Sequence, residues 1–352
     1  MTAHLIDDEG YTLIELIVAA ALLIMLSALT CSILMDARTA IDVSSERADL
    51  HQRARVGTEA IASAIRDAGA GSTRGINAGP LVRWLPPVWP GRSNRTDSTR
   101  AVTTIHVLPD VPPATLRFDV PADATTLDFD HGGGCSLPCG FFDRMTIVLL
   151  DGLGNFDVFV VLQTDGASAT VRRLAGGTRA SYASGIAVLP AELRTVYWNA
   201  DTRELRTDGG DRTDFPVVNE VVDLSFEYFG DPLPPAEPRP PAGVENCLYD
   251  TAGLAWPGLQ LFERVGGTMA LLSPAVFEDG PWCGSGTEPF DADLLRIRSV
   301  RATARLQTSN ALYRGADARW FRHPGLAADG ARTIRDFVVE TTITPRNLGG
   351  WR

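Results

Sequence analysis

The sequence predicts an α+β protein in which a long N-terminal α-helix packs on a mainly antiparallel β-sheet domain. Three observations indicate this fold class. Residues 16–35 are apolar and carry no charge, and a helical apolar stripe continues beyond them to about residue 68. After residue 71, Gly, Pro and Thr become common and short runs typical of strands replace the helical period. We therefore expect one helix of about 60 residues, then a β-rich domain.

The apolar run at 16–35 has the length of a membrane span. At about 1.5 Å per residue, a helix of this length covers about 30 Å, which is the thickness of the hydrocarbon core of a bilayer. Its hydroxyl side chains, Ser27, Thr30 and Ser32, can bond back to helix carbonyls. We interpret residues 11–35 as a transmembrane helix.

A cleaved secretory signal is the main alternative for this end of the chain. Such a signal has a basic start and a shorter apolar core. Residues 1–10 instead contain Asp7, Asp8 and Glu9 and neither Lys nor Arg. The composition therefore favours an acidic leader followed by a membrane helix.

Residues 36–70 are predicted to be an amphipathic continuation of the same helix. Gly69 and Gly71 mark its end. An independent coiled coil is the alternative, but the apolar positions are rich in Ala and span few heptads. We expect this outer half to pack on a sheet through one apolar stripe, formed by Leu50, Ala54, Ile61, Ile65 and Ala68.

Residues 71–352 are predicted to form the β-rich domain. Turn sequences at 152–155 and 199–202 each predict a hairpin. A Pro-rich, acidic segment near 231–245 is read as a loop, and it is where we would place a boundary between two lobes. Strands are expected at 102–108, 115–120, 145–151, 156–163, 194–198, 204–206, 217–229, 294–307 and 334–344.

The junction before the apolar run reads Gly-Tyr-Thr-Leu-Ile-Glu-Leu from Gly10 onward. This motif resembles the processing site of type IV prepilins and of the pseudopilins of type II secretion. The resemblance implies that a membrane aspartic peptidase cleaves after Gly10 and methylates the new amine of Tyr11. It also implies that Glu15 stays in the membrane helix and directs assembly.

The physical chemistry of Glu15 agrees with that role. A charged side chain at mid-bilayer costs about 2.5–3.5 kcal/mol on insertion scales, so such a residue usually has a partner. The nearest candidate is the free amine of Tyr11, one helical turn away, in the same subunit or in a neighbour. Pairing in a low dielectric is strong and geometrically demanding. We therefore expect Glu15 to set the register of this subunit within a helical filament.

The rest of the chain resembles the large minor pilins of the PilW-like type. The resemblance is carried by the strand near 217–229, the Arg-lined strand near 294–307 and the Arg-Asn-Leu ending at 346–348. It implies a structural subunit of the complex that primes pilus assembly and sits at the pilus tip. The implied location is the bacterial inner membrane, with a single span and a periplasmic domain, and later the pilus.

The implied partners are other minor pilins, the major pilin, the prepilin peptidase and methyltransferase, and the inner membrane. Three alternatives stay open. The first is a minor pseudopilin of a type II secretion system, and the second is a tip adhesin that binds a surface ligand. The third is an enzyme tethered by its N-terminus, which predicts a cleft with clustered titratable groups.

Cysteine usage predicts disulfides in the outer domain. Cys31 lies in the apolar run and is interpreted as a small packing residue. The other four cysteines lie in the outer domain, and an even number of cysteines in an oxidising compartment indicates disulfides. A zinc site is the less favoured alternative. Three pairings are open, and we favour those that bracket local loops: Cys135 with Cys139, and Cys247 with Cys283.

No catalytic motif or cofactor site is evident, so we expect a protein that is not an enzyme and needs no cofactor. Asp128 and Asp130 are the best acidic pair for calcium, but a plain turn is the favoured interpretation. The same interpretation applies to Asp208, Asp211, Asp291 and Asp293. Removal of the three leader carboxylates changes the net charge from −11 to −8. An acidic chain argues against direct binding of nucleic acid, because phosphate contacts need positive patches.

Overall fold

The computed structural model describes residues 12–73, 79–91, 100–130, 140–174, 177–210, 214–259, 261–265, 267–273, 277, 292–327 and 332–348. This part of the chain contains one long α-helix and antiparallel β-sheets, so the predicted α+β class is confirmed. The chain divides into two compact units. Unit 1 comprises residues 1–51 and 308–335, and unit 2 comprises residues 52–307 and 336–352.

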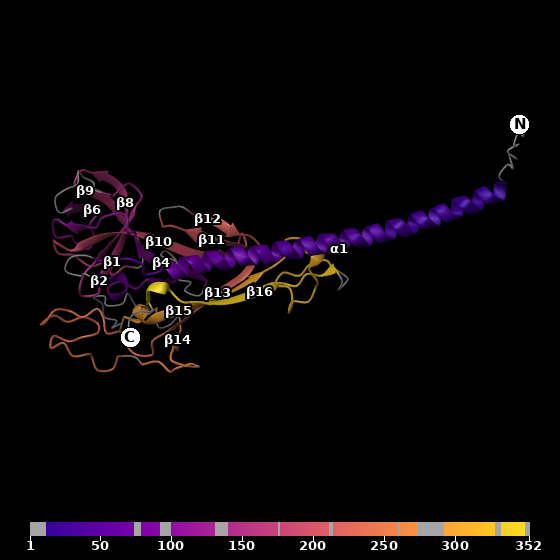
Figure 1. Ribbon diagram of the computed structural model, residues 1–352. Coiled ribbons are helices and arrows are strands. Elements are labelled where there is room, and N and C mark those ends of the chain that lie inside the picture. The colour runs from indigo at the N-terminus through magenta and orange to yellow at the C-terminus, as the bar shows by residue number, and fades with distance from the viewer. Residues whose placement is uncertain are drawn as a thin grey trace, which may run out of the picture. The chain divides into compact units, whose positions relative to one another are not determined.

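Helix α1 (Leu13–Asp67) is a single helix of 55 residues, drawn as one unbroken ribbon in Figure 1. At 1.5 Å per residue it is about 80 Å long. Arg66 lies in its last turn, where a cation is favoured by the helix dipole. Gly69 follows with a left-handed φ of 74°, and its N–H donates to Ile105 O at 2.8 Å. The predicted end of the helix at Gly69 is therefore confirmed.

The outer half of α1 buries the predicted apolar stripe. Gly57 shows how closely this part of the helix approaches the sheet. A Cβ added to Gly57 would lie 3.0 Å from Val218 Cγ2 and 3.4 Å from Leu205 Cδ2. A glycine in a helix interior costs about 1 kcal/mol relative to alanine, and here it permits this close packing. All five stripe residues are buried: Leu50, Ala54, Ile61, Ile65 and Ala68.

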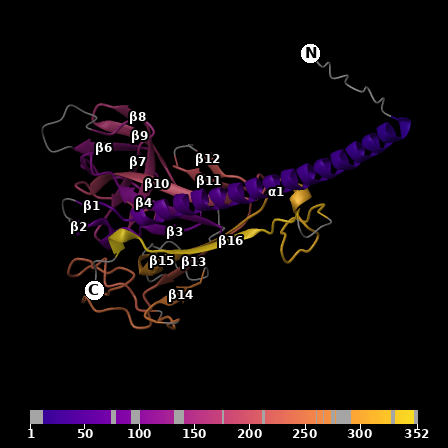
Figure 2. The same cartoon turned by 45° about the vertical axis from the view of Figure 1, so that its right-hand side comes forward.

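In the part of unit 2 that the structure describes, the larger sheet has ten antiparallel strands. Six of them, in the order β10-β5-β6-β9-β8-β7, close into a barrel, because Val188 of β10 pairs with Ala114 of β5 on one side and with Leu149 of β7 on the other. Figure 2 shows β6, β7, β8 and β9 grouped together. The strands are β3 (Val88–Pro90), β4 (Ala101–Val107), β5 (Ala114–Leu116), β6 (Thr126–Asp130), β7 (Thr146–Leu150), β8 (Phe156–Asp165), β9 (Ser168–Arg173), β10 (Ala187–Asn199), β11 (Glu204–Asp208) and β12 (Asp214–Val218).

Alternate residues of the six barrel strands form one buried cluster, as expected for a barrel interior. Leu127 and Phe129 of β6 and Phe159 of β8 belong to it. Phe141 packs edge-on against Phe129, with ring centroids 5.1 Å apart. Within the described residues, closure leaves the barrel strands no open edge to pair with another chain.

A second buried cluster covers the outer face of the barrel. It combines Val148 of β7 and Val158 of β8 with Leu81 and Trp89 of the segment before β4. Leu81 begins the 3-10 turn η2 (Leu81–Arg83), next to the short pair β1 (Ser72–Thr73) and β2 (Gly79–Pro80). The segment around η2 therefore packs on the outer face of the barrel and covers it.

The smaller sheet of unit 2 has four antiparallel strands in the order β14-β13-β15-β16. The predicted strands at 294–307 and 334–344 are confirmed with narrower bounds. Residues 294–296, the start of the first, instead belong to the 3-10 turn η4 (Asp293–Arg296). The strands are β13 (Val221–Gly230), β14 (Ala270–Leu272), β15 (Ile297–Leu306) and β16 (Phe337–Ile343), and short turns η5 (Ala311–Tyr313) and η7 (Arg346–Leu348) complete the described elements.

The strand predicted at 217–229 is confirmed from residue 221 onward, but it is not one continuous strand. The chain there forms the end of β12 and then most of β13, and these two strands belong to different sheets. Glu220 separates them with a left-handed φ of 56°, and its carboxylate accepts a bond from Arg203 at 3.2 Å. A non-glycine residue in this conformation interrupts the pleat, which a period-2 pattern does not reveal.

Both predicted hairpins are confirmed. In the first, Leu150 of β7 pairs with Phe156 of β8, and in the second Asn199 of β10 pairs with Glu204 of β11. The strand predicted at 115–120 is shorter than expected, because β5 ends at Leu116. The Pro-rich segment 231–245 contains no helix or strand and lies within unit 2.

Candidate functional site

The candidate site is the first turn of α1 together with the apolar surface that follows it. Thr12 and Glu15 form a reciprocal capping box at the helix start. The backbone N–H and the hydroxyl of Thr12 each donate to Glu15 Oε2 at 2.9 Å, and the N–H of Glu15 donates to Thr12 Oγ1 at 3.3 Å. The carboxylate therefore has a local partner within its own chain.

The sequence interpretation gave Glu15 the amine of Tyr11 as its candidate partner, in the same subunit or in a neighbour, and it missed this box. The signal was present, because Thr followed three residues later by Glu, just before an apolar run, is the signature of a capping box. An acidic residue in the first turn is also favoured by the helix dipole. Glu15 thus has a structural role at the helix start besides any role in assembly.

The apolar half of α1 has no cover from the described residues. Its large apolar side chains between residues 13 and 35 are 54–79 % exposed. A fully buried Leu or Ile side chain is worth about 1.5–3 kcal/mol relative to an exposed one, so this surface is costly in water. By length and composition α1 can cross a membrane, which agrees with a single N-terminal anchor.

Hydroxyl side chains in the apolar half bond back to the helix, as predicted for Ser27 and Thr30. Ser27 Oγ donates to Leu23 O at 2.7 Å, and Thr30 Oγ1 donates to Leu26 O at 3.0 Å. Their polar atoms are thereby satisfied without water. These residues are compatible with a lipid environment.

The predicted processing residues Gly10 and Tyr11 lie outside the described residues, so cleavage and methylation stay predictions. Cys135, Cys139 and Cys283 also lie outside them. Cys247 is disulfide-bonded, whereas Cys31 is free and exposed. The preferred pairing therefore stays a prediction.

Asp128 and Asp130 lie in strand β6 and not in a turn, so that interpretation is wrong. They alternate with the buried residues Leu127 and Phe129 and therefore lie on the outer face of the strand. The N–H of Arg117 donates to Asp128 O at 2.9 Å. Among the described residues, no three His, Cys, Asp or Glu side chains come together as metal ligands.

Asp293 lies in a turn, as predicted, but its side chain is buried. It lies at the start of η4 and is buried in an ion pair with Arg296, whose Nε is 2.8 Å from Asp293 Oδ1. The guanidinium of Arg296 also lies 4.7 Å from the centre of the Phe262 ring. Both charges are buried together, so each is the counter-charge that the other needs away from solvent.

Barrel strand β8 carries another buried charge that sequence reasoning did not find. Asp157 is fully buried, forms an ion pair with Arg173, and accepts bonds from the N–H groups of Arg179 and Ala180 at 3.1 Å. The hydroxyl of Tyr182 donates to it at 3.0 Å. Burial, and then the charge of Asp157, raise the pKa of Tyr182 above its ordinary value. Asp157 thereby holds the segment between β9 and β10.

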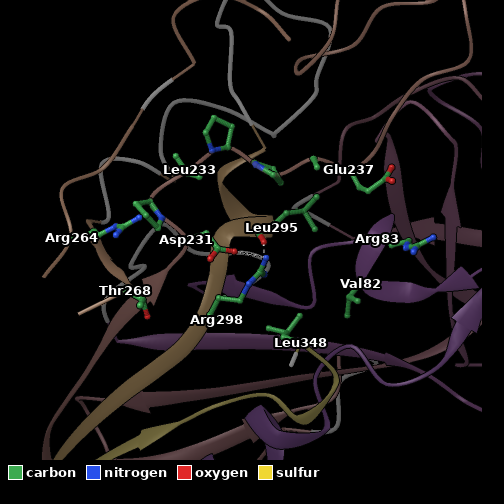
Figure 3. Close-up of a pocket in the computed structure, with 14 residues that line it drawn as sticks. Val82, Arg83, Asp231, Leu233, Glu237, Arg264, Thr268, Leu295, Arg298 and Leu348 are labelled. Carbon is green, nitrogen blue, oxygen red and sulfur yellow. Dashed lines mark hydrogen bonds and ion pairs between the residues drawn. The ribbon is translucent and has the colours of Figure 1, made fainter. Parts of the chain in front are cut away.

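Unit 2 also has a cavity of about 550 Å³ beside the Pro-rich segment (Figure 3). Arg298 donates to Leu295 O at 2.8 Å and forms an ion pair with Asp231 at 2.7 Å. The charges of Arg298 and Asp231 therefore compensate each other within the chain. Among the described residues, the lining contains a hydroxyl from Thr268 but no His, Ser or Cys. This arrangement offers no nucleophile with an adjacent base, and the absence of enzymatic activity stays a prediction.

No family model, curated protein or solved structure matches this chain. The fold is therefore described by its own geometry. The resemblance to prepilins rests on the residues from Gly10 to Leu16 and on the helix that follows them.

Proposed function

We propose that this protein is a minor type IV pilin, a structural subunit of the complex that primes pilus assembly and occupies the pilus tip. The observation that carries the proposal is the position of Glu15. This carboxylate sits in the first turn of a helix whose next twenty residues are charge-free and exposed, five residues after Gly10. The partners are other pilins, the processing peptidase and the inner membrane.

The exposed apolar half of α1 supports a subunit that moves between two apolar environments. Lipid covers such a helix before assembly, and neighbouring helices cover it within a filament. Either cover removes the same side chains from water. The outer half of α1 packs on the subunit's own sheet and so contributes to folding. The apolar half is left to anchor the subunit.

The capping box is compatible with a role of Glu15 in assembly. Both Thr12 donors contact Oε2, and an ionised carboxylate has several acceptor positions on its two oxygens. Oε1 can therefore receive a charge-assisted bond from the amine of Tyr11 in a neighbouring subunit. Thr12 orients the carboxylate at the helix start, where that amine would approach.

Mass spectrometry of the N-terminus tests the processing step. Protein is isolated from membranes of cells with and without the prepilin peptidase. We expect a first residue of N-methylated Tyr11 when the peptidase is present and intact Met1 when it is absent. Intact Met1 in both strains, or cleavage elsewhere, contradicts the proposal.

Two variants separate the charge of Glu15 from its capping role. Glu15→Gln keeps a capping side chain and removes the charge, whereas Thr12→Ala removes the cap and keeps the charge. If Glu15 pairs with an amine, Glu15→Gln abolishes incorporation into filaments and Thr12→Ala leaves it largely intact. The reverse ranking, measured by immunogold counts on sheared filaments, would show that only the helix start matters.

Pilus and secretion roles are separated by deleting the gene. If the protein is a minor pilin, the deletion strain should lose its surface pili while exported hydrolases still reach the medium. Loss of secretion with normal pili would instead assign the protein to a type II secretion system.

A further inference from the structure

The 308–335 segment of unit 1 differs in charge from the rest of the chain. It contains five arginines and two aspartates, a net charge of +3, within a protein of net charge −11. Four of these arginines, Arg319, Arg322, Arg332 and Arg335, are exposed. The 308–335 segment is therefore a local basic surface on an acidic protein.

This segment is attached to α1 just beyond the apolar run. The hydroxyls of Thr308 and Ser309 both donate to Glu46 Oε1, the second at 3.3 Å. The segment forms one compact unit with the first part of the helix, and both ribbon views draw it beside the middle of α1 (Figures 1 and 2). Contact with Glu46 thus places the basic surface on the flank of α1, beyond its apolar half.

The distances along the helix bring this surface to the level of lipid headgroups. Glu46 follows Met35 by eleven residues, or about 16 Å of helix. The headgroup layer adds about 5–8 Å to each side of the hydrocarbon core. A compact segment of this length has a radius of gyration of about 8 Å, so one attached at Glu46 reaches the bilayer surface.

The segment also exposes large apolar side chains that its own core does not use. Leu312, Trp320 and Leu326 are 61 %, 44 % and 75 % exposed, whereas Phe321 and Ile334 are buried. The guanidinium of Arg335 lies 4.0 Å from the centre of the Trp320 ring. Trp beside Arg is the composition found at membrane–water interfaces, where an apolar ring and a charged group meet headgroups together.

We infer that the 308–335 segment docks on anionic phospholipid headgroups and holds unit 1 against the bilayer surface before assembly. The arginines attract the phosphates, and the exposed Trp and Leu side chains enter the boundary layer. This inference rests on the membrane anchor in the proposed function. It adds a second contact with the membrane, made by a segment remote in sequence from the anchor.

The test uses the full-length protein in lipid nanodiscs, followed by hydrogen exchange of peptides within 311–327. One set of discs contains phosphatidylcholine, and the other contains equal parts of phosphatidylcholine and phosphatidylglycerol. We expect exchange to be slower by about tenfold or more in the anionic discs. The difference should shrink at 1 M salt, where the Debye length is only about 3 Å.

A charge variant and a matched control sharpen this test. Arg322→Gln, Arg332→Gln and Arg335→Gln together should abolish the lipid-dependent protection. Arg117→Gln, Arg172→Gln and Arg179→Gln together make the same charge change at exposed sites in unit 2 and should leave the protection intact. Circular dichroism confirms that each variant is folded.

The outcomes distinguish this inference from the proposed function. Equal exchange in both kinds of disc, with the protein inserted, overturns the docking and leaves the anchor standing. Protection that is independent of lipid charge but rises with the number of copies per disc would mean that a second subunit covers the 308–335 segment. That result also overturns the lipid docking. Failure of the chain to insert in either disc contradicts the anchor itself.

Discussion

Units 1 and 2 use the same apolar residue types in opposite ways. In unit 1, the Leu, Ile and Val side chains of the first half of α1 are exposed, and the ion pair between Asp317 and Arg319 lies at the surface. In unit 2, apolar side chains form two buried clusters, and the pair between Asp157 and Arg173 is buried. Unit 2 therefore stabilises itself through its own core, while the described residues leave the apolar half of α1 in unit 1 uncovered.

The difference follows from periodicity. The first half of α1 is apolar on all sides, which gives no preferred face for packing on the protein. The outer half confines its apolar residues to one stripe, and that stripe is buried. Matched substitutions at a buried and an exposed site can therefore test whether burial within the chain determines how much a residue contributes to stability.

The largest effect is expected from Asp157→Asn in unit 2. Removal of one partner from a buried ion pair typically costs about 3–5 kcal/mol, because Arg173 keeps a buried charge without compensation. The free energy of unfolding, measured with guanidinium in detergent micelles, should fall by this amount. The matched change in unit 1, Asp317→Asn, should produce a much smaller shift, since that pair is exposed and screened by solvent. Equal losses would remove the contrast between the units.

A similar contrast is expected within α1. Ile65 is fully buried, so Ile65→Ala should lower the free energy of unfolding by about 2–5 kcal/mol through lost burial and a residual cavity. Leu23→Ala removes a comparable side chain from the exposed half and should leave the unfolding of unit 2 unchanged. A large loss for Leu23→Ala would mean that this half packs on the protein after all.

A smaller loss is expected from Gly57→Leu. A Cβ at this position meets Val218 at 3.0 Å, so a larger side chain forces the helix away from β11 and β12. Overpacking of this kind costs about 1–3 kcal/mol. Arg55→Leu, two residues earlier on the exposed face, is the control and should be neutral. Thermal melts followed by circular dichroism measure both variants, and a stabilised Gly57→Leu protein would contradict the close packing.

The smallest effect concerns pH. A hydrogen bond from Arg319 lowers the pKa of Asp317 to about 2, from its ordinary value of 3.8. Because the folded pKa is depressed, the stabilisation from this pair is complete above pH 3.8 and is lost as the pH falls toward 2. Carboxyl NMR titration should show this value, and Arg319→Gln should move it back toward 3.8. An unchanged pKa in the variant would assign the shift to another cause.

Several features were predictable from local sequence. The helix, its buried stripe, its end at Gly69 and both hairpins follow from periodicity and turn residues that act over a few positions. The capping box of Thr12 and Glu15 was equally local, although it was overlooked. The break in the predicted strand 217–229 was missed because Glu220 has a left-handed φ of 56°, which a period-2 pattern does not report.

The sequence by itself determined the α+β class, the membrane-length helix and the change from an all-apolar to a one-sided pattern along α1. These features depend on interactions between residues a few positions apart. Only the tertiary structure decided that β10 closes the barrel by pairing with both β5 and β7, that Asp157 and Asp293 are buried, and that the 308–335 segment lies on α1 at Glu46. Contacts between residues far apart in the chain leave no periodic trace, because they depend on how the elements meet in space.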